Sequence, residues 1–349
     1  MQTFEFNCTT HYKSTVMIDI LILIAGLALI LLGANYLVDG ASAIAKRFGI
    51  SDFIIGMTIV GIGTSTPEMV VSILSAAKGN ADIAVGNIVG SNLFNVLMIL
   101  GVTALVTPLP LTSNNIKKDI PFALLAALTL AFAGSDILFD GAASNIVSRT
   151  DGLMLLSLFA VFMAYTIYSS QSAGAELPQA ETTSQNGAAE TQAKPKPIWL
   201  SLIMVVGGLA GLVYGGDLFV ASASAIAKML GVSDAVIAVT IMAGGTSLPE
   251  LASCIVAAVK KNTDLALGNV IGSNVSNIFL ILGGSAIIHP LGMNNIGQMD
   301  LGFLILSSIL LFITAFTFKK RSLDRVEGLL FILIYIGYVI LTIKNGAIA

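Results

Sequence analysis

The chain has 349 residues, of which 56% are hydrophobic and 11% are charged, with a formal net charge of −3. Soluble domains carry about a quarter of charged residues, so this composition excludes a protein whose whole surface faces water. The small net charge gives no indication of a nucleic-acid partner, and two cysteines provide no disulfide framework. The composition predicts an all-α polytopic membrane protein.

The apolar runs predict the membrane spans. Residues 1–16 are polar and irregular and are interpreted as an N-terminal tail, and the first apolar run begins at Met17. The runs are close to the roughly 20 residues that cross a bilayer. Ten transmembrane helices are predicted, over residues 17–38, 53–77, 83–107, 119–135, 152–169, 198–221, 235–259, 265–290, 300–318 and 327–344.

A change in composition divides the chain after the fifth span. Residues 170–197 are rich in Ala, Gln, Ser, Thr, Glu and Pro and contain almost no large apolar side chains. Such a segment is predicted to be a disordered linker. It separates a first five-helix unit, residues 17–169, from a second, residues 198–349.

The two units repeat each other at one constant offset, 182 residues (68 to 250). SAIAK occurs twice, GISD matches GVSD, and GNIVGSN matches GNVIGSN. Matches in one register over this length indicate internal duplication. Because each copy has an odd number of spans, the second must enter the membrane in the opposite direction, which predicts two inverted-topology repeats.

The basic residues predict the orientation. Twelve lie on one side of the predicted spans: Lys46, Arg47, Lys117, Lys118, Lys194, Lys196, Lys260, Lys261, Lys319, Lys320, Arg321 and Arg325. The other side has Lys13, Lys78, Arg149, Lys228 and Lys344. Cytoplasmic loops carry the excess of Lys and Arg, so both termini are predicted to be extracytoplasmic and the 170–197 linker cytoplasmic.

One motif interrupts a span in each copy. GIGTSTPE occupies 61–68 in the second apolar run, and AGGTSLPE occupies 243–250 in the seventh. Glycine and proline inside a transmembrane helix release backbone carbonyls from intrahelical hydrogen bonds. Each motif ends on a glutamate, which is costly at that depth unless it faces a cavity, a partner or an ion. Matched interruptions in two halves indicate an ion site.

The interrupted spans contain the oxygen ligands that a hard divalent cation such as Ca²⁺ prefers. Each supplies a glutamate, a threonine carbonyl one turn earlier and a serine hydroxyl, and two facing carboxylates would neutralise one Ca²⁺. The alternative is that each carboxyl is protonated and packs against the backbone groups released by its proline. The candidate metal ligands are Glu68, Glu250, Thr64, Thr246, Ser65 and Ser247.

The following span of each copy adds polar residues one helical turn apart, which places them on one helix face. These further candidate ligands are Ser91 and Asn95, and Ser273 and Asn277. The alternative is that they only form hydrogen bonds between helices. The remaining asparagines of the repeated segment fall on other faces and are interpreted as structural: Asn87, Asn92, Asn269 and Asn274.

Nothing in the sequence predicts an enzyme. His11 and His289 lack a second histidine or cysteine at metal-ligand spacing. No glycine-rich phosphate loop follows a predicted strand, and no serine has a histidine base at a suitable depth.

Together, GIGTSTPE…GNIVGSNLFN and AGGTSLPE…GNVIGSNVSN resemble the two α-repeats of the sodium/calcium exchanger family, within the cation/Ca²⁺ antiporter superfamily. The size is similar to that of its prokaryotic ten-span members. The resemblance implies exchange of Na⁺ for Ca²⁺ across an inner or plasma membrane by alternating access. Ca²⁺ would lie between the two glutamates, and Gly61 and Ala243 would join the site.

The resemblance also implies Ca²⁺ and Na⁺ as substrates in a lipid bilayer, with no cofactor, no nucleic acid and no obligate protein partner. Some family members carry Asp where this chain has Asn277. Only two carboxylates then remain in the predicted site, which argues against K⁺ co-transport.

Other reactions stay open. A Ca²⁺/H⁺ antiporter would use the same glutamates, although the hydroxyl and carbonyl ligands beside them favour Na⁺. A gated cation channel is a third reading, but helices broken in an inverted repeat favour a carrier. We expect the first and sixth spans to slide across the other eight, on account of their glycines: Gly26, Gly33, Gly207, Gly208, Gly211 and Gly215.

Overall fold

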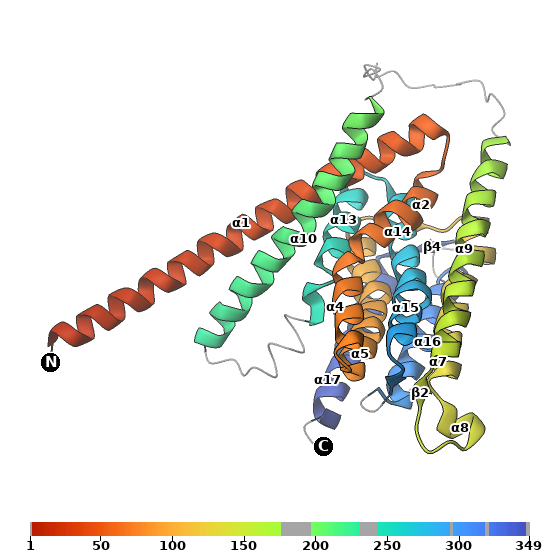
Figure 1. Ribbon diagram of the computed structural model, residues 1–349. Coiled ribbons are helices and arrows are strands. Elements are labelled where there is room, and N and C mark those ends of the chain that lie inside the picture. The colour runs from red at the N-terminus through yellow and green to blue at the C-terminus, as the bar shows by residue number, and fades with distance from the viewer. Residues whose placement is uncertain (1, 176–196, 231–242, 294–295, 318–320, 347–349) are drawn as a thin grey trace.

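Two long helices cross at one side of the molecule (Figure 1). The computed structural model describes residues 2–175, 197–230, 243–293, 296–317 and 321–346. In it, α1 runs over Gln2–Phe48 and α10 over Ile198–Met229. No glycine or proline precedes Gly26, so nothing interrupts the first helix. The stretch interpreted as an irregular N-terminal tail, residues 1–16, is therefore helical from Gln2 and continuous with the first span.

Glycines bring the backbones of α1 and α10 into direct contact. A Cβ atom on Gly33 would lie 2.7 Å from the carbonyl oxygen of Gly208, and one on Gly208 would lie 2.6 Å from the backbone nitrogen of Leu37. Gly26 and Gly215 form an equivalent contact further along the crossing. Small residues permit this approach, as they do between helices in membranes. These glycines thus join α1 to α10, whereas we expected them to ease the sliding of both helices over the rest of the protein.

The next segment is a broken helix, as predicted. It comprises α2 (Asp52–Ile55), the π-helical turn η1 (Gly56–Val60), α3 (Gly61–Thr64) and α4 (Thr66–Ala77), with a bend of 47° before α4. Pro67 has no N–H to donate to the carbonyl of Gly63, and the hydroxyl of Thr66 takes that place at 2.6 Å. The second copy is broken between α12 (Ala243–Gly245) and α13 (Leu248–Val259), beside Pro249.

Two unbroken helical segments form the centre of the molecule. One consists of α5 (Ala81–Leu93), η2 (Phe94–Ile99) and α6 (Leu100–Val106). The other consists of α14 (Thr263–Ser276), η5 (Asn277–Leu282) and α15 (Gly283–Ile288). A Cβ atom on Gly272 would lie 2.0 Å from the carbonyl oxygen of Met57, so α14 touches the backbone of the first broken helix.

The remaining helices surround this centre. They are η3 (Asn115–Asp119), α7 (Ile120–Ala133), α8 (Asp136–Asp140), α9 (Arg149–Ala175), α16 (Gln298–Ile313) and α17 (Arg325–Gly346). Because α9 ends at Ala175, the first residues of the predicted 170–197 linker are helical. Residues 176–196 of that linker lie outside the described residues.

Four two-residue strands, which the sequence did not predict, connect the two halves. β1 (Leu109–Pro110) pairs with β4 (Ser322–Leu323), and β2 (Ile146–Val147) pairs with β3 (Leu291–Gly292), both antiparallel. Each pair joins a strand of one copy to a strand of the other. Figure 1 places β4 and β2 toward opposite ends of the molecule. Each of these two small sheets therefore contains one strand from each copy.

The described helices include six that are long and apolar enough to cross a membrane, or seven if the bent pair Asp52–Thr64 and Thr66–Ala77 is one span. Two shorter apolar helices, Leu248–Val259 and Gln298–Ile313, lie below that length. Length and composition thus confirm a polytopic helical membrane protein but do not by themselves reach ten spans.

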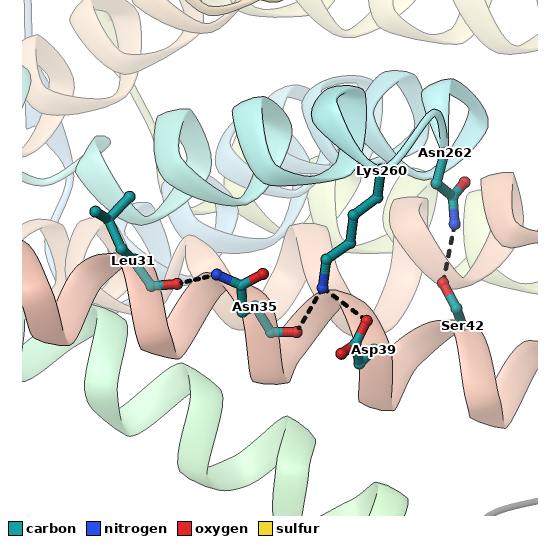
Figure 2. A network of polar contacts seen from close by, with 6 residues as sticks. All are labelled: Leu31, Asn35, Asp39, Ser42, Lys260 and Asn262. Atoms are coloured by element: carbon teal, nitrogen blue, oxygen red, sulfur yellow. Dashed lines mark hydrogen bonds and ion pairs between the residues drawn. The ribbon is translucent and has the colours of Figure 1, made fainter.

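Polar contacts tie α1 to the turn between α13 and α14 (Figure 2). The ammonium group of Lys260 lies 2.7 Å from a carboxylate oxygen of Asp39 and donates to the carbonyl of Asn35 at 3.3 Å. The amide of Asn262 donates to the hydroxyl of Ser42 at 2.9 Å. These contacts lie at the end of α1 nearest Phe48.

Candidate ion-binding site

The two glutamates of the repeated motif lie in equivalent places. Glu68 is in the first turn of α4 and Glu250 is in the first turn of α13, and both are 0% exposed. Each carboxyl group thus lies at a helix N-terminus, where the partial positive charge of the backbone favours an anion. A buried charge still requires a partner, a proton or a cation.

Each carboxyl group accepts a hydrogen bond from a serine of the opposite copy. The hydroxyl of Ser247 donates to Oε1 of Glu68 at 2.8 Å, and that of Ser65 donates to Oε1 of Glu250 at 3.0 Å. The structure therefore brings the two predicted glutamates and the two predicted serines together, with each Ser–Glu hydrogen bond made across the repeats and not within one motif.

Several oxygen atoms of the predicted site residues have no hydrogen-bond partner. Among the described residues, eight buried side-chain polar atoms lack one, and five of these belong to predicted ligands. They are Oε2 of Glu68, Oε2 of Glu250, Oδ1 of Asn95, Oδ1 of Asn277 and Oγ1 of Thr246. Buried oxygen atoms are costly without a partner, so unpartnered oxygens on several predicted ligands suit a bound cation.

Other predicted site residues already have protein partners. The hydroxyl of Ser91 donates to Oε1 of Glu68 at 3.4 Å, whereas that of Ser273 donates to the carbonyl of Gly61 at 3.1 Å. The hydroxyl of Thr64 donates within its own helix to the carbonyl of Val60 at 3.0 Å. Ser273 thus forms an interhelical hydrogen bond, and its lone pairs stay available to the predicted cation. Ala243 is the first residue of α12, and nothing about its side chain belongs to the described structure.

All four asparagines interpreted as structural contact site residues. Asn87 donates through Nδ2 to the backbone carbonyl of Glu68 at 3.2 Å within its own copy, and the other three make contacts across the copies. Asn269 approaches the hydroxyl of Thr64 with its Oδ1 at 3.2 Å, and Asn92 and Asn274 bond the amides of Asn277 and Asn95. Helix-face arguments missed these three because their partners belong to the opposite copy. The only sequence signal is that each recurs at the same place in both copies.

The site has two acids and otherwise neutral oxygen donors. Among the described residues, no group of three or more His, Cys, Asp or Glu side chains is arranged to hold a metal ion. Two carboxylates surrounded by hydroxyl and amide oxygens suit a hard cation that binds and leaves, because fewer charged ligands give weaker binding.

Comparisons with known proteins place the chain in one family. A model of the family described as sodium/calcium exchanger protein matches residues 18–168 and 200–344. The chain is 36% identical over 327 residues to a putative antiporter, CaxA, from Alkalimonas amylolytica, covering 92% of this chain and 98% of that protein. It is 30% identical over 347 residues to the sodium/calcium exchanger MaX1 of Methanosarcina acetivorans, covering 93% and 98%.

A solved structure shows the same architecture. The sodium-calcium exchanger NCX_Mj superposes with a TM-score of 0.76 at 31% identity, covering 92% of this chain and 97% of that one. These matches extend over both copies of the repeat. The chain therefore belongs to the sodium/calcium exchanger family, whose members are ion transporters rather than enzymes.

Proposed function

We propose that the protein is a secondary antiporter that exchanges Na⁺ for Ca²⁺ by alternating access, with Ca²⁺ held between Glu68 and Glu250. The observation that carries the proposal is that two buried carboxyl groups each accept a hydrogen bond from a serine of the opposite copy, while five oxygen atoms of the predicted ligands, one on each carboxyl group among them, lack hydrogen-bond partners. Two carboxylates balance one Ca²⁺, and the neutral hydroxyl and carbonyl oxygens beside them suit Na⁺ when Ca²⁺ leaves.

We place the site within ten spans arranged as two inverted five-helix repeats. Three reciprocal features support this symmetry: the exchanged strand pairs, the crossed Ser–Glu bonds and the mutual contacts of Asn92 and Asn274. The proposed ten spans exceed the six or seven long helices among the described residues. The difference arises because the proposal also counts the second broken helix and shorter helices such as Gln298–Ile313 as spans.

The distribution of charge supports an orientation with both termini outside and the linker in the cytoplasm. In Figure 1 both chain ends lie toward the lower part of the view, while the end of α1 and the start of α10 lie toward the top. Lys46 and Arg47 form the last turn of α1, at that upper end. Positive charge marks the cytoplasmic side.

We infer that ions reach the site from one end of the molecule. A cavity of about 510 Å³ lies between α4, α10 and α13 and is bordered by Thr246, whose hydroxyl has no hydrogen-bond partner. It lies in the half of α10 nearest Met229, whereas the contacts of Lys260 and Asn262 in Figure 2 hold α1 at the opposite end. We assign the cavity as the route for ions in this conformation, and α1 with α10 as the pair that moves.

Replacing Asp39 with asparagine is expected to favour opening at the end that Figure 2 shows. The Lys260–Asp39 pair is partly exposed, with side chains 31% and 44% accessible, so its loss is worth about 0.5–1 kcal/mol. This shifts the equilibrium between the two conformations by about 2–5-fold. The apparent KM for Ca²⁺, measured in sided membrane vesicles, should fall at the cytoplasmic face and rise at the other.

Lys261→Gln is the matched control, because this neighbouring lysine forms no ion pair with any residue that the structure describes. It should leave both KM values unchanged. Equal changes at the two faces in Asp39→Asn would contradict the assignment of this contact to one end.

The experiment that tests the proposed function is Ca²⁺ uptake into proteoliposomes, comparing an outward Na⁺ gradient with an outward H⁺ gradient. We expect uptake with Na⁺ and none with H⁺ alone. Uptake driven only by H⁺ would replace the proposal with a Ca²⁺/H⁺ antiporter that uses the same glutamates. Single-channel currents in planar bilayers would replace it with a cation channel.

A further inference from the structure

Four asparagines form a connected set of hydrogen bonds between the segment α5–η2 and the segment α14–η5. Asn92 donates through Nδ2 to the carbonyl oxygen of Asn274 at 3.3 Å, and Asn274 donates through Nδ2 to the carbonyl oxygen of Asn92 at 3.3 Å. Asn277 donates to Oδ1 of Asn92 at 3.1 Å, and Asn95 donates to Oδ1 of Asn274 at 3.0 Å. All four side chains are at most 5% exposed.

The geometry points to Asn92 and Asn274 as positioning residues that turn the amide oxygens of Asn277 and Asn95 toward the cation. This rests on the proposed function, in which the site binds a cation. The two residues act through other side chains and are not themselves ligands.

A backbone carbonyl sets the direction of each amide. The carbonyl oxygen of Asn274 can only accept a hydrogen bond, so the Asn92 atom facing it must be Nδ2. Oδ1 of Asn92 then faces Asn277, which must present its own Nδ2 in return. The oxygen of Asn277 is left pointing away from this contact. The same series of contacts, starting from the backbone carbonyl of Asn92, orients Asn274 and then Asn95.

As a result, Asn95 and Asn277 each use their amide nitrogen in a hydrogen bond, while their amide oxygen has no partner. Oδ1 of Asn95 and Oδ1 of Asn277 are two of the buried atoms that lack a hydrogen bond among the described residues. An amide oxygen is a ligand for a hard cation, whereas an amide NH₂ group carries partial positive charge and repels one. The orientation therefore decides whether these side chains bind or exclude the ion.

Asparagine is the side chain that suits positions 92 and 274. It combines a donor for the opposite backbone carbonyl with an acceptor for the neighbouring amide, on one short planar group. Leucine keeps a similar branched shape but has neither, so the amide of Asn277 would lose the contact that orients it. Partners beyond the direct ligands commonly change metal affinity by about 10–100-fold.

The test is equilibrium binding of radioactive Ca²⁺ to the purified full-length protein, comparing wild type with Asn92→Leu. We expect the Kd for Ca²⁺ to rise about 10-fold or more. Ser276→Ala is the matched control on α14, because this buried hydroxyl donates only within its own helix, to the carbonyls of Gly272 and Ser273. It should leave the Kd unchanged.

A double-mutant cycle separates positioning from packing. If Asn92 acts through Asn277, Asn92→Leu should add almost nothing in an Asn277→Ala background, since the oriented oxygen is already gone. Asn274→Leu with Asn95→Ala repeats the cycle from the other copy, which keeps the test available if Asn92→Leu does not fold. Losses that add in both cycles, or a Kd for Asn92→Leu within about twofold of wild type, would overturn the inference. Wild-type protein that binds no Ca²⁺ would instead contradict the proposed function.

Discussion

Glu250→Gln is expected to lower Ca²⁺ binding and transport by about 100-fold or more, and Glu68→Gln should do the same. Removing one member of a buried, mutually dependent set of charges costs about 3–5 kcal/mol, and each 1.4 kcal/mol is tenfold in affinity. Glutamine keeps the size of the side chain and can still accept the hydrogen bond from Ser65, so the loss reports the missing charge. Ca²⁺ uptake into proteoliposomes and equilibrium Ca²⁺ binding measure it.

Glu327→Gln is the matched control for the same chemical change. Glu327 is 3% exposed, lies in the first turn of α17, and accepts hydrogen bonds from the hydroxyl of Thr317 and the backbone nitrogen of Asp324. This variant should retain Ca²⁺ affinity, although its stability can change. If Glu250→Gln transports Ca²⁺ at the wild-type rate, the glutamates are not ligands of the transported ion.

Gly208→Ala is expected to be the most damaging single-atom change at the crossing of α1 and α10. Its Cβ atom would lie 2.6 Å from the backbone nitrogen of Leu37 and 2.7 Å from the carbonyl oxygen of Gly33, and neither can move without shifting a helix. Such overpacking costs about 1–3 kcal/mol or more. Thermal unfolding of the purified protein should show this loss, and transport should slow because α1 and α10 can no longer move as a pair.

The adjacent glycine provides the control. A Cβ atom on Gly207 would meet nothing within 4 Å, so Gly207→Ala should be neutral or slightly stabilising, because alanine favours a helix more than glycine does. Equal effects at 207 and 208 would show that helix propensity, and not the contact with α1, decides the outcome. Ca²⁺ binding in Gly208→Ala should persist in the fraction that remains folded, since Gly208 touches no residue of the site.

Local chemistry explains why the broken helices were predictable. Pro67 and Pro249 cannot donate a backbone hydrogen bond, and a glutamate follows each of them inside an apolar run. These are properties of single residues and their immediate neighbours, so the sequence alone locates the helix breaks and the two acids. Repetition in one register then indicates that both belong to the same kind of site.

Partners across the two copies were not predictable in this way. The sequence placed Ser65 beside Glu68, yet its hydroxyl bonds Glu250. Helix-face arguments set Asn92 and Asn274 apart from the site, yet they bond two of its asparagines. The first outcome depends on how the junction of α3 and α4 meets α13, and the second on how α5 and η2 meet α14 and η5. No spacing within one helix specifies either contact.

The amino-acid sequence by itself determined that this is a helical membrane protein, that it contains a duplication, and that two interrupted spans carry the acids. Hydrophobicity, residue spacing and the missing N–H of proline suffice for these conclusions. Only the tertiary structure decided that α1 and α10 contact through glycine, that strands pair and serines bond glutamates across the two copies, and which amide oxygens lack a partner. Those features arise where residues far apart in the chain meet, so their energies depend on packing between the copies and not on local sequence.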